Sequence, residues 1–110
     1  MDRVINGTLT ATLRHEIQEY AGDVHTPFGQ SQLYFTENAD QQVFCITIPH
    51  ISSDLPAELL IMAHIADDHI VIDIDNTDKP LVEALLQAGV LPEQIVLAWQ
   101  LPDKSRQTLL

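Results

Sequence analysis

The stretch from Ile61 to Gln100 constrains the fold most. It contains two strands with alternating apolar residues, a helix with recognisable start and stop signals, and a final strand. An apolar alternation that begins at Leu59 reaches a turn at Asp67–Asp68 and resumes from Ile70 to Asp75. Alternation with a period of two on both sides of a short turn predicts a β-hairpin.

A two-residue loop at Asp67–Asp68 would set the register of this hairpin, with Ala66 opposite His69. The pairs on one face are then wholly apolar: Ile65 with Ile70, Ala63 with Ile72, and Ile61 with Ile74. The pairs on the other face are mixed: His64 with Val71, Met62 with Asp73, and Leu60 with Asp75. The first face is therefore expected to join the core, and the second to be at least partly wet.

A helix is expected next, because the run from Asn76 to Pro80 offers N-cap side chains and then a proline that only the first turn of a helix tolerates. Its expected buried side consists of apolar residues: Leu81, Val82, Leu85 and Leu86. Gly89 stands where a left-handed residue closes a helix, with Val90 placed for a Schellman contact. The apolar run from Ile95 to Trp99 predicts a strand that is central or covered on both faces.

The N-terminal half predicts another helix and another strand pair. Leu9, Leu13, Ile17 and Tyr20 form one stripe at helical spacing, which favours a helix from Thr8 to Ala21 with Gly22 as its C-cap. His25 to Gly29 reads as a loop, Leu33 to Phe35 as a strand, and Val43 to Ile48 as its antiparallel partner. Ile51 to Pro56 is expected to be a loop. The chain should form a single α+β domain over residues 1–110, with a mainly antiparallel sheet of about five strands and two helices.

Composition narrows the function classes. The chain has 110 residues, 45% of them apolar, and a net charge of −11 from 16 acidic and 5 basic residues. So acidic a chain is a poor candidate for direct nucleic-acid binding, since Lys and Arg supply phosphate affinity, and it favours a basic protein partner. Acidity that serves only solubility is the alternative. With neither a long apolar run nor a signal peptide, we expect a cytoplasmic protein without membrane contact.

One motif points to catalysis. The sequence from Ile70 to Thr77 matches the strand and paired aspartates that open haloacid-dehalogenase phosphatases, which would make Asp73 and Asp75 the catalytic groups of a small metal-dependent phosphohydrolase. That strand should lie in a parallel sheet, whereas here it follows a hairpin and only 35 residues remain after it. The competing interpretation is that both aspartates line a solvated strand, with Asp75 or Asp78 also serving the next helix.

A metal site and a nucleophile are also weak candidates. His64, His69, Asp73 and Asp75 have suitable ligand chemistry, but His69 lies past the turn, so at most two or three of them converge. The single cysteine, Cys45, sits in an apolar strand and is expected to be a reduced, buried thiol. We therefore expect no metal, no cofactor and no catalytic residue.

The mixed face of the hairpin is better explained as a contact surface. A domain this small cannot cover both faces of its sheet with two helices, so apolar residues on the second face favour an interface with another chain. The expected partner interface comprises Leu60, Met62, His64, Val71, Asp73, Asp75 and Arg106.

Several motifs together resemble a known family. They are Glu19–Ala21, Asp67–Ile72, Asn76–Asp78, Pro102 with Arg106–Thr108, and above all the block from Leu81 to Leu97. The combination resembles the XisI family, the fdxN element excision controlling factors found mainly in cyanobacteria. The resemblance implies an α+β fold and no known catalytic residue. It also implies a genetic partner, XisH, that has an endonuclease-like fold.

The resemblance and the charge together predict a non-enzymatic accessory or regulatory protein. It would act by binding an XisH-like partner during DNA element excision or its regulation. Carboxylates on the exposed hairpin face and the second helix could occupy a basic DNA-binding cleft of that partner. A homo-oligomer is also compatible with so small a domain.

Overall fold

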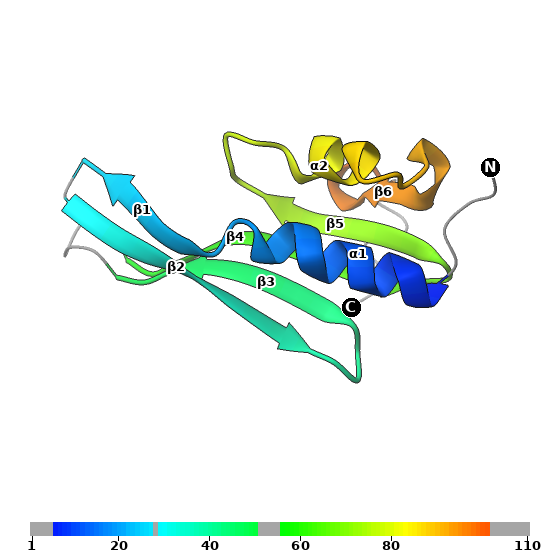
Figure 1. The fold of residues 1–110 in the computed structure, drawn as a ribbon, viewed down its shortest axis with the longest axis horizontal. Coiled ribbons are helices and arrows are strands. Elements are labelled where there is room, and N and C mark those ends of the chain that lie inside the picture. The colour runs from blue at the N-terminus through cyan, green and yellow to red at the C-terminus, as the bar shows by residue number, and fades with distance from the viewer. Residues whose placement is uncertain (1–5, 28, 51–55, 102–110) are drawn as a thin grey trace.

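A computed structural model of the chain describes residues 6–27, 29–50 and 56–101 (Figure 1). The elements in chain order are α1 (Asn6–Gln18), β1 (Gly22–Thr26), β2 (Gly29–Asn38), β3 (Val43–Ile48), β4 (Glu58–Ala66), β5 (His69–Asp75), α2 (Leu81–Gln87) and β6 (Ile95–Leu97). Short 3₁₀ turns, Pro92–Gln94 and Ala98–Gln100, flank β6. The predicted α+β class is confirmed, although the sheet has six strands rather than about five.

The sheet follows the chain in the order β1-β2-β3-β4-β5-β6. Neighbouring strands are antiparallel except β5 and β6, which are parallel because α2 forms a crossover between them. The additional strand is β1. Residues expected to form a loop around Pro27 instead form a hairpin in which Thr26 pairs with Gly29.

The core lies on one face of the sheet. In Figure 1, α1 runs across this face and α2 lies beside β5 and β6. Leu9, Leu13 and Ile17 of α1 are fully buried, as the helical spacing of apolar residues predicts. The strand residues that meet them alternate along each strand: Phe44, Ile46, Ile61, Ala63, Ile65, Ile70 and Ile72. Residues that point the opposite way from β3, β4 and β5 are only partly buried, and we call this side of the sheet the second face.

The hairpin register is confirmed for its first four pairs. Ala66 pairs with His69, and the pairing continues as predicted as far as Ala63 with Ile72. A β-bulge then intervenes, so that Asp73 is an extra residue, Met62 pairs with Ile74 and Ile61 pairs with Asp75. The predicted pairs Ile61–Ile74, Met62–Asp73 and Leu60–Asp75 are therefore wrong, because alternation alone does not reveal an inserted residue.

A second irregularity changes the position of Leu60. The β3–β4 pairing moves from Ile46 with Ile61 directly to Thr47 with Leu59, which leaves Leu60 as the extra residue. Leu60 packs against the core instead of facing away from it. The expectation that Leu60 shares the second face with Met62 is wrong for this reason.

The helix ends also differ from the prediction in part. Helix α1 ends at Gln18 instead of Ala21, and Gly22 opens β1 with a φ of 118° instead of capping the helix. The closure of α2 is confirmed: Gly89 has a φ of 101°, and the Val90 amide donates to the Leu85 carbonyl at 3.0 Å.

Two apolar residues near the C-terminal end of the described chain lie differently from the prediction. Leu86 is 40% exposed rather than buried, because it points away from the side of α2 that carries Leu81 and Leu85. The run from Ile95 to Trp99 forms only three strand residues, at the edge of the sheet, before it turns into the 3₁₀ segment. Trp99 is exposed as a result.

Two predictions fall on residues that the structure does not describe. They concern residues 51–55 of the expected loop from Ile51 to Pro56, and Arg106 in the C-terminal segment. Among the described residues, no helix combines the length and the apolar character needed to cross a membrane.

Candidate functional site

His64 and Asp73 form the most polar feature of the second face. The bulge turns Asp73 toward His64 of the neighbouring strand, and the distance between His64 Nδ1 and Asp73 Oδ2 is 2.7 Å. The hydrogen bond to Asp73 raises the pKa of His64 more than partial burial lowers it, and the attraction between the charges adds to the rise. The prediction that His64 and Asp73 lie on the same face of the hairpin is confirmed, and one hydrogen bond joins them.

Cys45 lies beside this pair and is half-buried, not fully buried as predicted. Burial raises the pKa of its thiol, and the Asp73 carboxylate raises it further, against a smaller lowering by a hydrogen bond with Thr36. A thiol with a raised pKa holds little thiolate and is a poor nucleophile. The geometry therefore gives no support to cysteine catalysis.

Asp75 organises the start of α2. Its Oδ1 accepts hydrogen bonds from the amide and the hydroxyl of Thr77, at 3.1 and 2.6 Å, and its Oδ2 accepts one from the Leu81 amide at 2.7 Å. A carboxylate at a helix N-terminus satisfies a donor that lacks a partner within the helix and meets the positive end of the helix dipole. The prediction that Asp75 or Asp78 stabilises the N-terminus of the next helix is thus confirmed for Asp75.

The two aspartates of the phosphatase-like motif are held by different partners. Asp73 faces His64 on the second face, whereas Asp75 binds the α2 start on the helix side of β5. Strand β5 is also antiparallel to β4, whereas the motif belongs to a strand within a parallel sheet. A cavity of about 310 Å³ is lined by both Asp73 and Asp75. Each carboxylate is already held by its own structural partners, however, which argues against a shared phosphate site.

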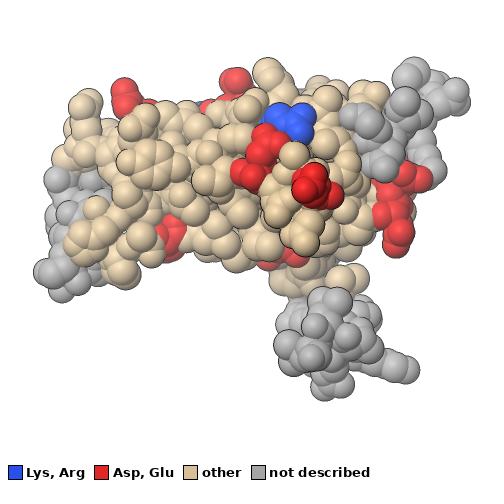
Figure 2. Space-filling model, turned by 90° about the horizontal axis from the view of Figure 1, so that it is seen from below, with Lys and Arg blue, Asp and Glu red and all other residues tan. Residues whose placement is uncertain are grey.

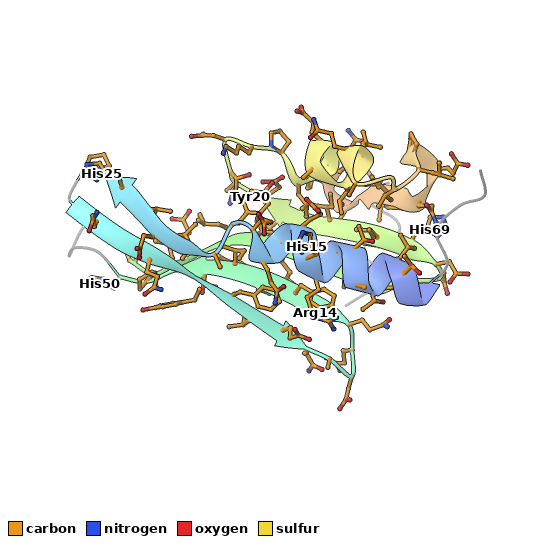
Figure 3. The ribbon with its side chains drawn as sticks, in the orientation of Figure 1. Arg14, His15, Tyr20, His25, His50 and His69 are labelled. Atoms are coloured by element: carbon orange, nitrogen blue, oxygen red, sulfur yellow. The ribbon has the colours of Figure 1, made fainter. Side chains whose placement is uncertain are left out.

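The remaining histidines are dispersed. Figure 3 shows His25 and His50 near one end of the sheet and His69 at the other. His69 Nδ1 lies 2.6 Å from the carbonyl oxygen of Asp67 within the hairpin turn, away from the His64 pair. Within the described ranges, no three His, Cys, Asp or Glu side chains are grouped so as to hold a metal ion.

The second face is otherwise mostly uncharged. Met62 and Val71 flank His64 and are half-buried, and Tyr34 of β2 is 49% exposed. Among the described residues of β3, β4 and β5, Asp73 is the acidic residue whose side chain lies on this face. Partly exposed apolar side chains around a satisfied polar pair are typical of a protein-contact surface.

A different surface, between the two helices, carries the concentrated negative charge. A cavity of about 510 Å³ lies between the end of α1 and the start of α2, and its lining includes four carboxylates, those of Glu16, Glu19, Asp78 and Glu83. The Tyr20 hydroxyl donates a hydrogen bond to the Lys79 carbonyl and so ties α1 to the loop before α2. Burial raises the pKa of Tyr20, and the nearby Asp75 carboxylate adds to this effect.

An apolar cavity of about 350 Å³ adjoins the acidic one. Its apolar lining comes from the part of the sheet beyond the end of α1: Val24, Leu33, Ile48 and Leu60. The two cavities share Tyr20, Asp78 and Lys79. We call the pair of cavities the helix-side groove. In Figure 3, Tyr20 marks the position where its two halves meet.

Sequence reasoning missed this groove, although one signal pointed to it. Glu16 and Glu19 stand at the C-terminal end of α1, where the helix dipole disfavours negative charge. Acidic residues at that end of the helix are a signal that sequence reasoning did not use. The apolar half depended on the unforeseen strand β1 and on the inward turn of Leu60, so the pattern alone could not reveal it.

The acidic balance extends over the surface. In Figure 2, acidic side chains appear in several places, and the basic area is small and adjoins acidic groups. Of the described basic residues, Arg14 is engaged by Glu37 through two hydrogen bonds of 3.0 and 3.2 Å. Its guanidinium also lies 5.3 Å from the centre of the Phe44 ring. These contacts leave Arg14 little capacity to bind phosphates.

Comparison with known proteins decides the family. The model of the family described as XisI protein matches residues 2–109. The chain belongs to the XisI family. The resemblance drawn from the sequence motifs is thereby confirmed. No curated protein matches this XisI family member.

Solved XisI structures share its fold. The crystal structure of a XisI-like protein from Anabaena variabilis ATCC 29413 is 20% identical and superposes with a TM-score of 0.62, covering 90% of this chain and 87% of the other. The fdxN element excision controlling factor XisI from the same organism is 19% identical, with a TM-score of 0.58, covering 86% of this chain and 95% of the other. At these identities the likeness concerns the fold.

Proposed function

We propose that this XisI family member is a controlling factor of DNA element excision that acts by binding a protein partner and not by catalysis. Family membership supports the process, since a solved relative of similar fold is an fdxN element excision controlling factor. The structural hydrogen bonds that hold Asp73 to His64, and Asp75 to Thr77 and Leu81, support the non-catalytic part of the proposal.

The partner we propose is an XisH-like protein with an endonuclease-like fold. DNA binding by such a protein requires a basic surface, and the observation that favours the pairing is the net charge of −11 on this chain. Opposite charges accelerate the encounter of this chain with a basic partner. The same negative charge makes this chain repel nucleic acid. Occupation of a DNA-binding surface by the acidic chain would gate access of the partner to DNA.

Two surfaces of the chain are candidates for this contact. The second face offers Met62, His64, Val71 and Asp73 as a mostly apolar contact patch. Leu60 and Asp75, expected in the same interface, point to the helix side, and Arg106 lies outside the described residues. The carboxylates that converge on one place, and so favour a basic partner most, are those of the helix-side groove.

A capture experiment tests the proposal. The full chain carrying an affinity tag would be expressed in its host and recovered at low and at high salt. We expect an XisH-like protein to be captured at about 50 mM salt and largely lost at about 500 mM, where charge interactions beyond a few ångströms are screened. Capture of DNA in place of protein, or capture indifferent to salt, would contradict the electrostatic mechanism.

A further inference from the structure

We propose that the helix-side groove binds a basic amphipathic segment of a protein partner, with an apolar side chain in the cavity lined by Leu60 and a Lys or Arg side chain in the cavity lined by Glu16 and Glu83. The inference rests on the proposed function and deepens it, because it names the surface of this chain that is used and the chemistry of the partner segment.

The apolar half supplies an anchor site. Val24, Leu33, Ile48 and Leu60 come from four different strands, and they line the part of the core-side sheet that α1 does not reach. All four are packed against or within the core, so the floor of the cavity is firmly supported. A cavity of about 350 Å³ lies in the size range of sites that take ligand groups, which is roughly 300–1,000 Å³.

The acidic half determines the charge of the occupant. Glu16 and Glu19 approach the cavity from α1, Glu83 approaches it from α2, and Asp78 approaches it from the connecting loop. Lys79 is the single basic residue in its lining. Carboxylates that converge from three segments attract a cationic side chain and repel an acidic one.

The two halves act as one surface because they meet at fixed residues. Tyr20, Asp78 and Lys79 line both cavities. The hydrogen bond from the Tyr20 hydroxyl to the Lys79 carbonyl fixes their junction. Apolar and cationic side chains that lie side by side on one segment are the hallmark of basic amphipathic helices, which bind in grooves of this kind.

Charge also distinguishes this occupant from a second copy of the chain. A second copy carries the same net charge of −11, and of its described basic residues Arg14 is paired with Glu37. Two such surfaces repel each other at the acidic half of the groove. A basic segment of another protein is attracted there, so it is the occupant that the charges select.

Fluorescence anisotropy with a defined probe tests the inference. The probe is a labelled helical peptide of about 12 Leu and Lys residues, long enough for three turns. One control peptide replaces each Leu with Ser, and a second replaces each Lys with Glu. We expect the probe to bind the full chain and both control peptides to lose at least about tenfold in affinity.

Matched variants locate the binding site. Glu16→Gln combined with Glu83→Gln should weaken probe binding about fivefold to tenfold, since two partly exposed charge contacts are lost. Asp40→Asn combined with Glu93→Gln removes the same charge from exposed positions outside the groove and should leave binding unchanged. Val24→Thr should weaken binding through the apolar half, whereas Val43→Thr makes the same change on the second face and should not.

The outcomes separate this inference from the proposed function. Equal binding by the groove variants and their controls, or no probe binding at all, overturns the groove assignment. Sedimentation of the chain as a dimer that the groove substitutions dissociate overturns it too, because a second copy would then be the occupant. If the groove variants still capture the host partner, the groove assignment fails while the proposed function stands. If the unaltered chain captures no protein, the proposed function itself fails.

Discussion

Removal of the Asp75 carboxylate should destabilise the fold more than removal of any exposed carboxylate nearby. In Asp75→Ala, the Leu81 amide at the start of α2 and the Thr77 amide lose their acceptor, whereas the Thr77 hydroxyl keeps the Lys79 carbonyl at 2.8 Å. Loss of a carboxylate that caps a helix costs about 1–2 kcal/mol, and loss of the Thr77 contacts about 1 kcal/mol more. We therefore expect a loss of about 2–3 kcal/mol in the free energy of unfolding.

Urea denaturation followed by circular dichroism measures this loss directly. For a chain of this length each kcal/mol corresponds to about 4 °C, so the melting temperature should fall by roughly 10 °C. Asp78→Ala is the matched control, because Asp78 is an exposed carboxylate in the same loop, and it should change the free energy of unfolding by less than about 0.5 kcal/mol. Equal effects of the two substitutions, or a loss below about 1 kcal/mol for Asp75→Ala, would refute the assignment of Asp75 as the anchor of α2.

Further predictions concern other parts of the fold. Leu85→Ala should cost about 2–4 kcal/mol in urea denaturation and Leu86→Ala less than about 1 kcal/mol, because only Leu85 is buried; similar losses would contradict the observed face of α2. Gly89→Ala should cost about 1–2 kcal/mol, since its φ of 101° strains any residue with a Cβ, and an unchanged melting temperature would argue against the left-handed closure. Because Asp73 raises the pKa of His64, the pair stabilises the fold fully below the unfolded pKa of about 6.5 and loses this effect as pH rises through the higher folded-state pKa. The stability deficit of Asp73→Asn should shrink over that rise, and a deficit that grows would contradict the sign. Finally, hydrolysis of p-nitrophenyl phosphate with Mg²⁺ should stay at background, and turnover that Asp73→Asn abolishes would restore the phosphohydrolase alternative.

Local patterns predicted the elements of this fold best where side-chain chemistry determines the backbone. The hairpin turn at Asp67–Asp68, both ends of β3, and the Gly89–Val90 closure all follow from residue types at fixed spacing. Both turn aspartates have positive φ, which Asp tolerates better than most residues. These features depend on neighbours in sequence, so the sequence contains their cause.

Features that depend on inserted residues or on distant partners could not be predicted in the same way. The bulges that displace Asp73 and Leu60 leave the alternation of residue types almost unchanged, yet each one reassigns which face of the sheet the following residues share. Strand β1 is short and polar, and it is held mainly by pairing with β2. The helix-side groove depends on all of these features, and it therefore became apparent only in three dimensions.

The most direct test of the account is a calorimetric titration of the full chain into an XisH-like protein from the same host. We predict saturable binding at about 50 mM salt that weakens at least about tenfold at about 500 mM, because acidic groups of this chain meet a basic surface. Absence of any heat of binding at either salt concentration, from a partner that is folded and still binds DNA, would contradict the central claim.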